Sequence, residues 1–289
     1  MTIVPDPPVY ADYVLDALPG WRAAGLKTAL VTLVEISGSS PRPLGSQIAV
    51  AEDGRAIGAV TGGCVEQSIV LDAMAAIARR ESRLERYGEG SRFKDLKLPC
   101  GSGITVHFDV DMADDRLASL LEARAMRQVA RYTISADGLS FDKVYEPQRR
   151  LVIAGQGNVV PWLAKVAAMT EYQVMVFSPD DNSLNDPGDF DDGLLDAFTA
   201  FVSLFHDHSF EPELLDKALA SPAFYIGALG SRRAQAARLA TLAERGWDAA
   251  MLNRIHGPVG LDIGARTPPE IAVSIVAQVV EAARRKTEC

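Results

Sequence analysis

A cysteine inside a glycine turn is the feature of this sequence best suited to chemistry. Cys64 follows Gly62 and Gly63 and stands just before residues whose apolar spacing predicts a helix. Glycines let backbone amides approach a ligand closely, and the partial positive charge at a helix N-terminus favours the thiolate of a cysteine there. The turn therefore suits a soft, anionic sulfur beside amides that bind oxyanions. The same pattern fits a nucleophile, a redox-sensitive thiol or a metal ligand, and it equally fits a small buried residue in a tight turn.

The loop ahead of this turn adds polar groups to the candidate site. Residues 39–45 supply Ser40 and Arg42, and Arg42 together with the amides of the glycine turn would bind the anionic groups of a ligand. Glu66 follows Cys64 by two positions, and we rank capping of the helix that presents Cys64 above direct ligand contact. Hydrolysis by a serine nucleophile is disfavoured, because the loop lacks a G-x-S-x-G sequence and no histidine adjoins it.

A second cysteine stands in a similar turn. Cys100 lies between Pro99 and Gly101, just before residues 104–110, which read as a strand. We take it as a site candidate of second rank. The chain has three cysteines, none at C-x-x-C spacing, which favours reduced thiols in a cytoplasmic protein over disulfides or structural zinc.

A basic helix start lies in the second half of the chain. Residues 227–233 place Arg232 and Arg233 in the first turn of a predicted helix, where the helix dipole alone disfavours positive charge. A bound phosphate would relieve this repulsion, with Gly230, Ser231 and the free amides as further contacts. Carboxylates of another domain or subunit would do the same. The alternative is a helix capped by Ser231 whose arginines are simply solvated.

A partial dinucleotide-binding pattern occurs earlier in the same half. Gly155 and Gly157 occupy a predicted strand-to-helix turn, but Val160 replaces the third small residue of G-x-G-x-x-G. The acid expected to bind a ribose comes late, at Asp180. NAD(P) binding is therefore weakly supported against a purely structural turn, and it remains the alternative cofactor.

Residues 206–208 contain two histidines that follow a predicted strand. Alternate residues at the end of a strand often point in opposite directions, and spacing reveals no third ligand. A polar strand-to-helix turn is the preferred interpretation over a metal site.

The elements that would position these residues indicate an α/β protein of two domains, divided near residue 150. In the first half, residues 10–24 and 117–129 and those after Cys64 read as helices, while residues 28–36, 47–51, 56–60 and 104–110 read as strands. Short strands are expected between residue 129 and residue 149. The second half alternates the two types, which predicts a doubly wound parallel sheet. Its expected elements are 151–154, 159–168, 173–177, 199–205, 211–220, 224–227, 231–245 and 268–285.

Composition limits the class of partner. With 289 residues and 48% apolar content, the chain is long enough for two hydrophobic cores. A formal charge of -9 argues against general affinity for nucleic acid or anionic membrane. No apolar run approaches the length of a membrane span and the first residues do not resemble a signal peptide, so we expect a soluble, cytoplasmic protein.

The order of the motifs resembles that of the XdhC/CoxI family, the accessory proteins of xanthine dehydrogenase and related molybdenum hydroxylases. The resemblance extends over nearly the whole chain. The residues that carry it are 38–45 (GSSPRPLG) and 58–66 (GAVTGGCVE) in the first half, and 225–233 and 257–264 in the second.

The resemblance implies both an architecture and a role. It implies an N-terminal mixed α/β domain of XdhC/CoxI type over residues 1–149 and a Rossmann-like C-terminal domain over 150–289. Its members bind the molybdenum cofactor (molybdopterin), support exchange of a terminal oxo ligand for sulfur, and insert the product into the hydroxylase. Cys64 matches the cysteine implicated in holding the cofactor, and it would be the metal ligand. The expected partners are xanthine dehydrogenase or a related hydroxylase, a cysteine desulfurase and a second copy of the chain.

The sequence therefore favours a cofactor chaperone that is not itself an enzyme. An NAD(P)-dependent oxidoreductase that uses the Rossmann-like half is the alternative. The residues expected to contact the cofactor are Ser40, Arg42, Gly62, Gly63, Cys64, Glu66, Cys100, Gly230, Ser231 and Arg232.

Overall fold

The computed structural model describes residues 13–63, 65–91, 103–178, 186–205 and 210–287. The chain divides into two compact units, Met1–Pro147 and Gln148–Cys289. Each unit has its own hydrophobic core, and we describe each separately.

The first unit is built on an antiparallel sheet of five strands in the order β3-β2-β1-β5-β4. Its central strand is rich in β-branched residues, which pack well on a pleated surface. The strands are β1 (Thr28–Ser37), β2 (Gln47–Ala51), β3 (Ala56–Gly58), β4 (Arg83–Gly88) and β5 (Gly103–Asp109).

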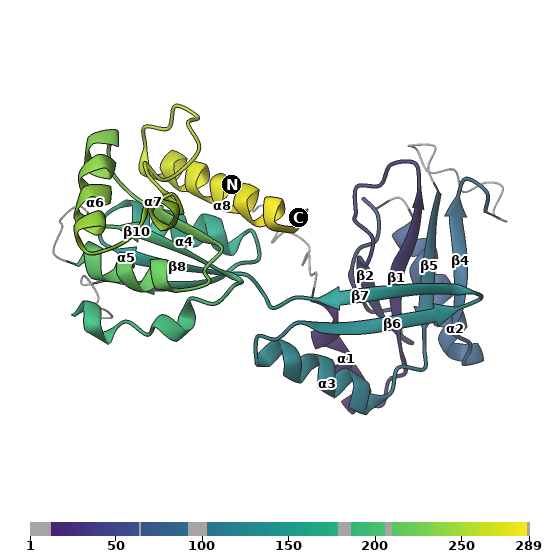
Figure 1. Ribbon diagram of the computed structural model, residues 1–289. Coiled ribbons are helices and arrows are strands. Elements are labelled where there is room, and N and C mark those ends of the chain that lie inside the picture. Colours follow the sequence, from purple (N-terminus) through teal and green to yellow (C-terminus); the bar gives the residue numbers. More distant parts are fainter. Residues whose placement is uncertain (1–12, 64, 92–102, 179–185, 206–209, 288–289) are drawn as a thin grey trace, which may run out of the picture. The chain divides into compact units, whose positions relative to one another are not determined.

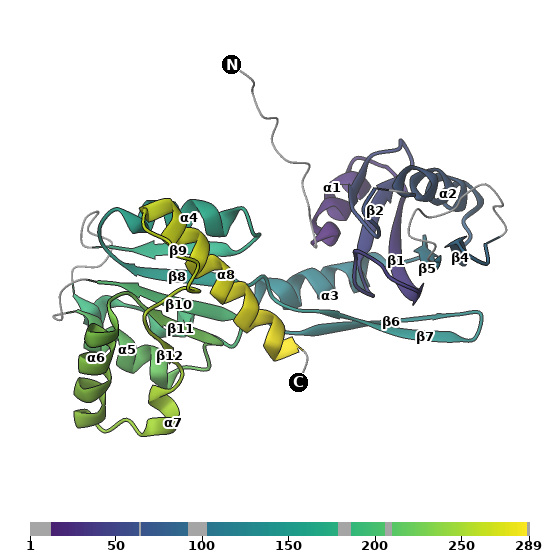
Figure 2. The same cartoon turned by 90° about the horizontal axis from the view of Figure 1, so that it is seen from above.

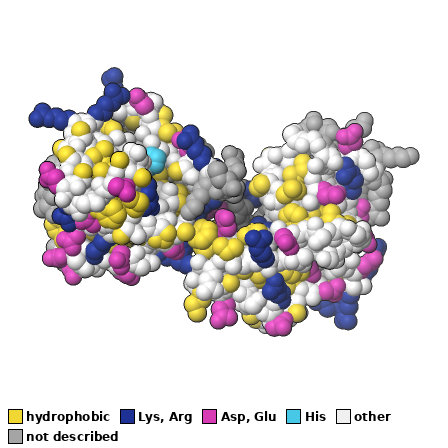
Figure 3. All heavy atoms as spheres, viewed as in Figure 1, with side chains coloured by type: hydrophobic (Ala, Val, Ile, Leu, Met, Phe, Trp, Pro, Cys, Tyr) yellow, Lys and Arg dark blue, Asp and Glu magenta, His cyan; other side chains and the backbone are white. Residues whose placement is uncertain are grey.

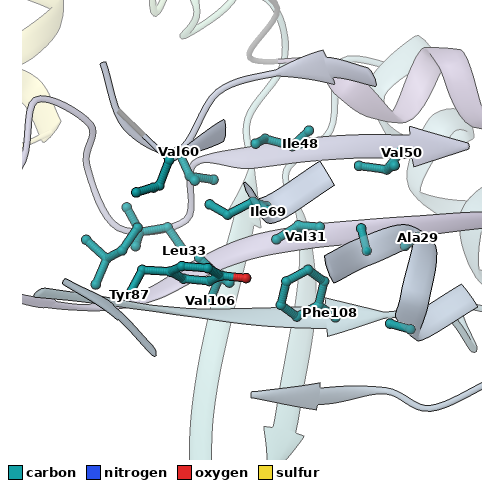
Figure 4. Close-up of a cluster of buried hydrophobic side chains, with 14 of the residues drawn as sticks. Ala29, Val31, Leu33, Ile48, Val50, Val60, Ile69, Tyr87, Val106 and Phe108 are labelled. Carbon is teal, nitrogen blue, oxygen red and sulfur yellow. The ribbon is translucent and has the colours of Figure 1, made fainter. Parts of the chain in front are cut away.

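Helix α2 (Glu66–Arg79) covers one face of this sheet. It contacts β1 and β2, and its buried residues recur at helical spacing. Figure 4 shows Ile69 of α2 above Val31 and Leu33 of β1, with the rings of Tyr87 and Phe108 completing the core. This packing fixes the start of α2, which follows the glycine turn in the chain.

The opposite face is covered by α1 (Ala17–Ala23), α3 (Asp114–Ala125) and a hairpin of β6 (Ala130–Ala136) and β7 (Leu139–Tyr145). Figure 1 shows the hairpin lying across the strands of the sheet. Polar contacts attach it there. The Tyr145 hydroxyl donates to Gln47 Oε1 at 3.1 Å, and the Tyr132 hydroxyl donates to Asp109.

His107 of β5 is buried, and it should make the stability of the first unit depend on pH. Burial lowers the pKa of His107 below its ordinary 6.5, and the carboxylates of Asp109 and Asp137 only partly oppose this. As a result, the imidazole of His107 takes up a proton more readily in the unfolded chain than in the folded chain. The contribution of His107 to stability is therefore complete above about pH 6.5 and is lost as the pH falls below it, by up to ~1.4 kcal/mol per pH unit.

A His107→Gln variant should show a shallower loss of stability between about pH 6.5 and 5 than the wild type. The measurement is urea unfolding followed by fluorescence of the buried Trp21, with Trp162 and Trp247 replaced by phenylalanine in both proteins. Parallel pH profiles for the two proteins would contradict the prediction.

The second unit contains a parallel sheet of five strands in the order β12-β11-β10-β8-β9. Counted along this unit, the order is 2-1-3-4-5, one of the common doubly wound arrangements. The strands are β8 (Arg150–Gly155), β9 (Gln173–Phe177), β10 (Thr199–Leu204), β11 (Tyr225–Ala228) and β12 (Ile255–His256).

Helices cover both faces of this sheet, as Figure 2 shows. On one face α4 (Val159–Ala168) packs against α8 (Pro268–Thr287). On the other lie α5 (Glu211–Ala220), α6 (Arg232–Glu244) and the short α7 (Ala249–Leu252). The predicted fold class, a mixed α/β domain followed by a Rossmann-like parallel sheet, is confirmed.

Several details differ from the sequence-based expectation. Strands β4 and β12 and the short helix α7 were not predicted, and α3 ends at Ala125, where the expected helix extended to residue 129. The described part of the first predicted helix is a 3-10 turn, Val14–Asp16, followed by α1. Among the described residues no helix combines the length and apolarity that crossing a membrane requires. On the face drawn in Figure 3, acidic and basic side chains are interspersed over both units.

Candidate cofactor-binding site

The loops predicted to form the site leave one end of the first unit's sheet. Loop 38–46 joins the end of β1 to the start of β2, and residues 59–65 join the end of β3 to α2. Strand β4 ends and β5 begins at this same end, because Gly88 pairs with Gly103 and Gly103 with Ser37. Antiparallel pairing thus gathers the loops around the glycine turn.

Arg42 and Ser40 hold the two loops in place. Arg42 is a buried residue, with 8% exposure, and its Nε donates to the carbonyl oxygen of Ala59 at 3.3 Å. The backbone N–H of Arg42 donates to Ser40 Oγ at 3.2 Å. Arg42 thereby ties loop 38–46 to the segment that leads into the glycine turn, and it lies beside that turn.

Glu66 closes the turn from its C-terminal side. Its carboxylate accepts hydrogen bonds from the Thr61 N–H at 2.7 Å, the Thr61 hydroxyl at 2.6 Å and the Val65 N–H at 3.2 Å. Glu66 is also the first residue of α2, where negative charge is favourable. These contacts give Glu66 a local structural role: its carboxylate bonds the turn that precedes α2, and among the described residues it accepts no hydrogen bond from a free amide within the helix.

The glycines between Thr61 and Val65 are exposed. Gly63 has a φ of +99°, a conformation that favours glycine, and no atom of the described residues lies within 4 Å of where its Cβ would stand. Among the described residues, a Cβ on Gly62 would meet only the ring of Pro41, at 3.5 Å. The described part of the chain therefore places little side-chain cover over the backbone of Gly62 and Gly63. Cys64 and Cys100 lie outside the described residues.

Sequence reasoning missed Arg86, which organises the same end of the sheet. Its Nη2 donates to Ser37 Oγ at 2.9 Å and its Nε to the Glu89 carbonyl oxygen at 2.8 Å. A Cβ on Gly103 would stand 2.7 Å from the Glu89 carbonyl oxygen and 2.8 Å from Arg86 Nη2, so a glycine is needed there. Arg86 thus joins the ends of β1 and β4 to the start of β5.

The second unit contributes the predicted basic helix start. Ser231 caps α6, with its Oγ accepting from the Ala234 N–H at 3.1 Å. Arg232 and Arg233 are exposed, and neither forms an ion pair within the described residues. The geometry confirms that Ser231 caps the helix. Neither guanidinium group is paired with a carboxylate of the described residues.

The partial dinucleotide pattern lies at the switch point of the parallel sheet. Strands β8 and β10 are adjacent there, and a Cβ on Gly155 would stand 2.7 Å from the backbone of Leu204. Ligands of doubly wound sheets bind outside the carboxyl ends of such strands. Asp180, His206 and His208 lie outside the described residues, and no described group of His, Cys, Asp and Glu is arranged to hold a metal.

The structure thus brings together Ser40, Arg42, Gly62, Gly63 and Glu66 at one end of the first unit. It places Gly230, Ser231 and Arg232 in the second. These features define a two-domain α/β protein with a glycine-turn loop cluster on its first domain and a Rossmann-like second domain.

Comparison with known proteins identifies the family. Residues 21–88 match the XdhC and CoxI family, and residues 151–279 match the XdhC Rossmann domain. The chain is 35% identical over 272 residues to the molybdenum cofactor insertion chaperone PaoD of Escherichia coli, which covers 89% of this chain and 83% of that protein. The chain belongs to the XdhC/CoxI family.

Two further relatives have similar extents. A protein of Bacillus subtilis described as a probable xanthine dehydrogenase subunit is 26% identical over 318 residues, covering 90% of this chain and 94% of that one. A crystal structure of a xanthine dehydrogenase from Bacillus halodurans superposes with a TM-score of 0.76 at 23% identity, covering 94% of this chain and 96% of that chain. At that identity the structural likeness establishes the fold.

Proposed function

We propose that this protein is an accessory protein of a molybdenum hydroxylase, which binds the molybdenum cofactor, supports its sulfuration and inserts it into the apo-enzyme. The observation that carries the proposal is the 35% identity, over most of both chains, to a molybdenum cofactor insertion chaperone. The cofactor is cargo in this role, so the protein needs a site that binds it and then releases it.

The loop cluster of the first unit suits that cargo. The cofactor carries a phosphate, a polar heterocycle and a metal bound by sulfur, which together call for backbone amides, arginine and a soft ligand. We assign Cys64 to the metal or its sulfur, and the Gly62 and Gly63 amides with Arg42 to anionic groups. Glu66 and Ser40 hold the loops that present these groups. Cys100 is a secondary candidate.

The loop that starts α6 is proposed as a separate phosphate contact. Gly230, Ser231 and Arg232 offer exposed backbone, a hydroxyl and a guanidinium without an ion-pair partner among the described residues. A phosphate there would be attracted to the positive N-terminal end of α6, which repels the two arginines. We further propose that the protein acts in the cytoplasm, as a homodimer, and that sulfur reaches the cofactor from a cysteine desulfurase.

The function is tested by anaerobic binding and transfer. Molybdenum cofactor released from a purified hydroxylase is mixed with the full chain, and the bound cofactor is measured after gel filtration. The loaded protein is then added to apo-hydroxylase, with and without cysteine desulfurase and cysteine. We expect co-elution of cofactor and protein and a rise in hydroxylase activity. Absence of co-elution would overturn the chaperone role.

An NAD(P)-dependent oxidoreductase is the rival function, because Gly155 and Gly157 lie at the switch point of the parallel sheet. Trp162 of α4 is 44% exposed, and its fluorescence would respond to a nucleotide bound at this end of the sheet. Titration with NADH and NADPH should leave its fluorescence without a saturable change at micromolar concentration. Saturable micromolar binding would favour the oxidoreductase.

A further inference from the structure

A buried ion pair lies at the carboxyl ends of the strands in the second unit's sheet, next to residues 229–231, the loop that precedes α6. Arg238 of α6 is 5% exposed and Glu211, the first residue of α5, is 2% exposed. Arg238 Nε donates to Glu211 Oε2 and Arg238 Nη2 to Glu211 Oε1, both at 3.0 Å. This bidentate pairing leaves the other N–H groups of the guanidinium to reach further partners.

The ion pair also contacts the loop after β11, through Arg238, and the end of β10, through Glu211. Arg238 Nη2 also donates to the carbonyl oxygen of Leu229 at 2.6 Å, just ahead of Gly230 and Ser231. Glu211 Oε1 accepts from Ser203 Oγ at 2.8 Å, and the Leu229 N–H donates to the Ser203 carbonyl oxygen at 2.9 Å. The pair therefore contacts the Leu229 carbonyl oxygen directly through Arg238, and it is linked to the Leu229 N–H through Ser203.

The same network reaches β12. Arg238 Nη1 donates to Gln235 Oε1 at 2.5 Å, and Gln235 Nε2 donates to the Ile255 carbonyl oxygen at 3.4 Å. A Cβ on Gly257 would stand only 2.0 Å from Gln235 Oε1. Through Glu211 and Gln235, the guanidinium of Arg238 is thus connected to β10 and β12, and it contacts the loop after β11 directly.

A buried ion pair of this kind need not add to the stability of the fold. A buried ion pair can often be exchanged for apolar residues of similar volume without loss of stability. A lysine would retain the charge, but its ammonium cannot form the planar, bidentate set of contacts that includes Leu229.

We propose that Arg238, paired with Glu211, is a positioning residue that holds Leu229 to Ser231 in the conformation presenting Ser231 and Arg232 to a phosphate. The inference rests on the proposed phosphate role of that loop. Arg238 itself is buried and contacts the loop backbone, so it acts through the loop.

The test uses the full chain and three variants. These are Arg238→Lys, the apolar double variant Glu211→Leu with Arg238→Met, and Arg245→Met as the control. Arg245 pairs with Asp216 at the exposed end of the same helix, away from the network. Hydrogen exchange of the 229–235 amides and the affinity for inorganic pyrophosphate are measured for each.

We expect amide exchange in this loop to be about tenfold faster in the lysine and double variants, with the rest of the unit unchanged. Pyrophosphate affinity should fall about tenfold in both, while the control resembles the wild type. Arg232→Ala should weaken pyrophosphate binding less in the double variant than in the wild type, because the two changes act on one loop. A purely structural pair would not produce this coupling.

The outcomes separate the inference from the function on which it rests. Unchanged exchange and affinity in both variants would overturn the positioning role of Arg238 and leave the phosphate role intact. A wild-type chain without pyrophosphate affinity would overturn the phosphate role and, with it, the functional part of this inference. Should the double variant fail to fold, the lysine variant still decides, because it retains the charge.

Discussion

Replacing Cys64 by serine is expected to weaken binding of the molybdenum cofactor about 100-fold, or about 2.7 kcal/mol. A thiolate is a soft, anionic ligand, whereas a serine hydroxyl stays neutral at pH 7 and is a poor ligand for a sulfur-bound metal. The substitution is nearly isosteric, so the turn closed by Glu66 should keep its hydrogen bonds. The measurement is the cofactor retained by each protein after anaerobic gel filtration at several concentrations.

Cys100→Ser provides the matched control, since Cys100 is the other cysteine next to a glycine turn. We expect a smaller effect from this change, in keeping with its second rank. Equal retention by wild type and Cys64→Ser would remove Cys64 from the binding site while leaving the chaperone function open. Loss of retention in both variants would instead indicate that the two thiols hold the cofactor together.

The fold was largely predictable because its strands carry strong local signals. The β-branched run of β1 and the strand-helix alternation of the second half appear directly in the sequence. Strand β4 was missed because charged side chains occur on both its faces, such as Arg83 and Arg86. Arg83 lies over the ring of Phe108, and Arg86 donates to Ser37 on β1. Partners so distant in sequence give no local pattern.

The site was predictable only where its contacts are local. The carboxylate of Glu66 bonds groups within five residues, and Ser231 caps its own helix, so spacing sufficed for both. Arg238 and Glu211 are separated by 27 residues and meet only because β10 and β11 are adjacent. The assignment of Cys64 to the cofactor stays a prediction, because this residue lies outside those the structure describes.

Gly58→Ala is expected to destabilise the first unit by about 3–5 kcal/mol, from backbone strain and overpacking together. Gly58 ends β3 with a φ of +101°, and its Cβ would stand 2.3 Å from the backbone oxygen of Gln47 and 2.5 Å from Val14 Cγ1. The Gln47 oxygen belongs to the neighbouring strand and cannot move alone. Relief would require β2 and β3 to separate, which would displace the segment that leads into the Cys64 turn.

Gly54→Ala separates strain from collision, because Gly54 has a similar φ of +90° but its nearest neighbour, Met74 Sδ, would be 3.6 Å from the new Cβ. We expect Gly54→Ala to lower the free energy of unfolding by about 1 kcal/mol, because only the left-handed backbone conformation is strained. Urea unfolding followed by Trp21 fluorescence, in proteins with the other two tryptophans replaced, measures both. Equal effects would mean that the backbone conformation, and not the close approach of β2 and β3, makes glycine necessary at position 58. A difference of about 2 kcal/mol or more would show instead that the close approach of β2 and β3 makes glycine necessary at position 58. That strand contact would then be what positions the segment leading into the glycine turn.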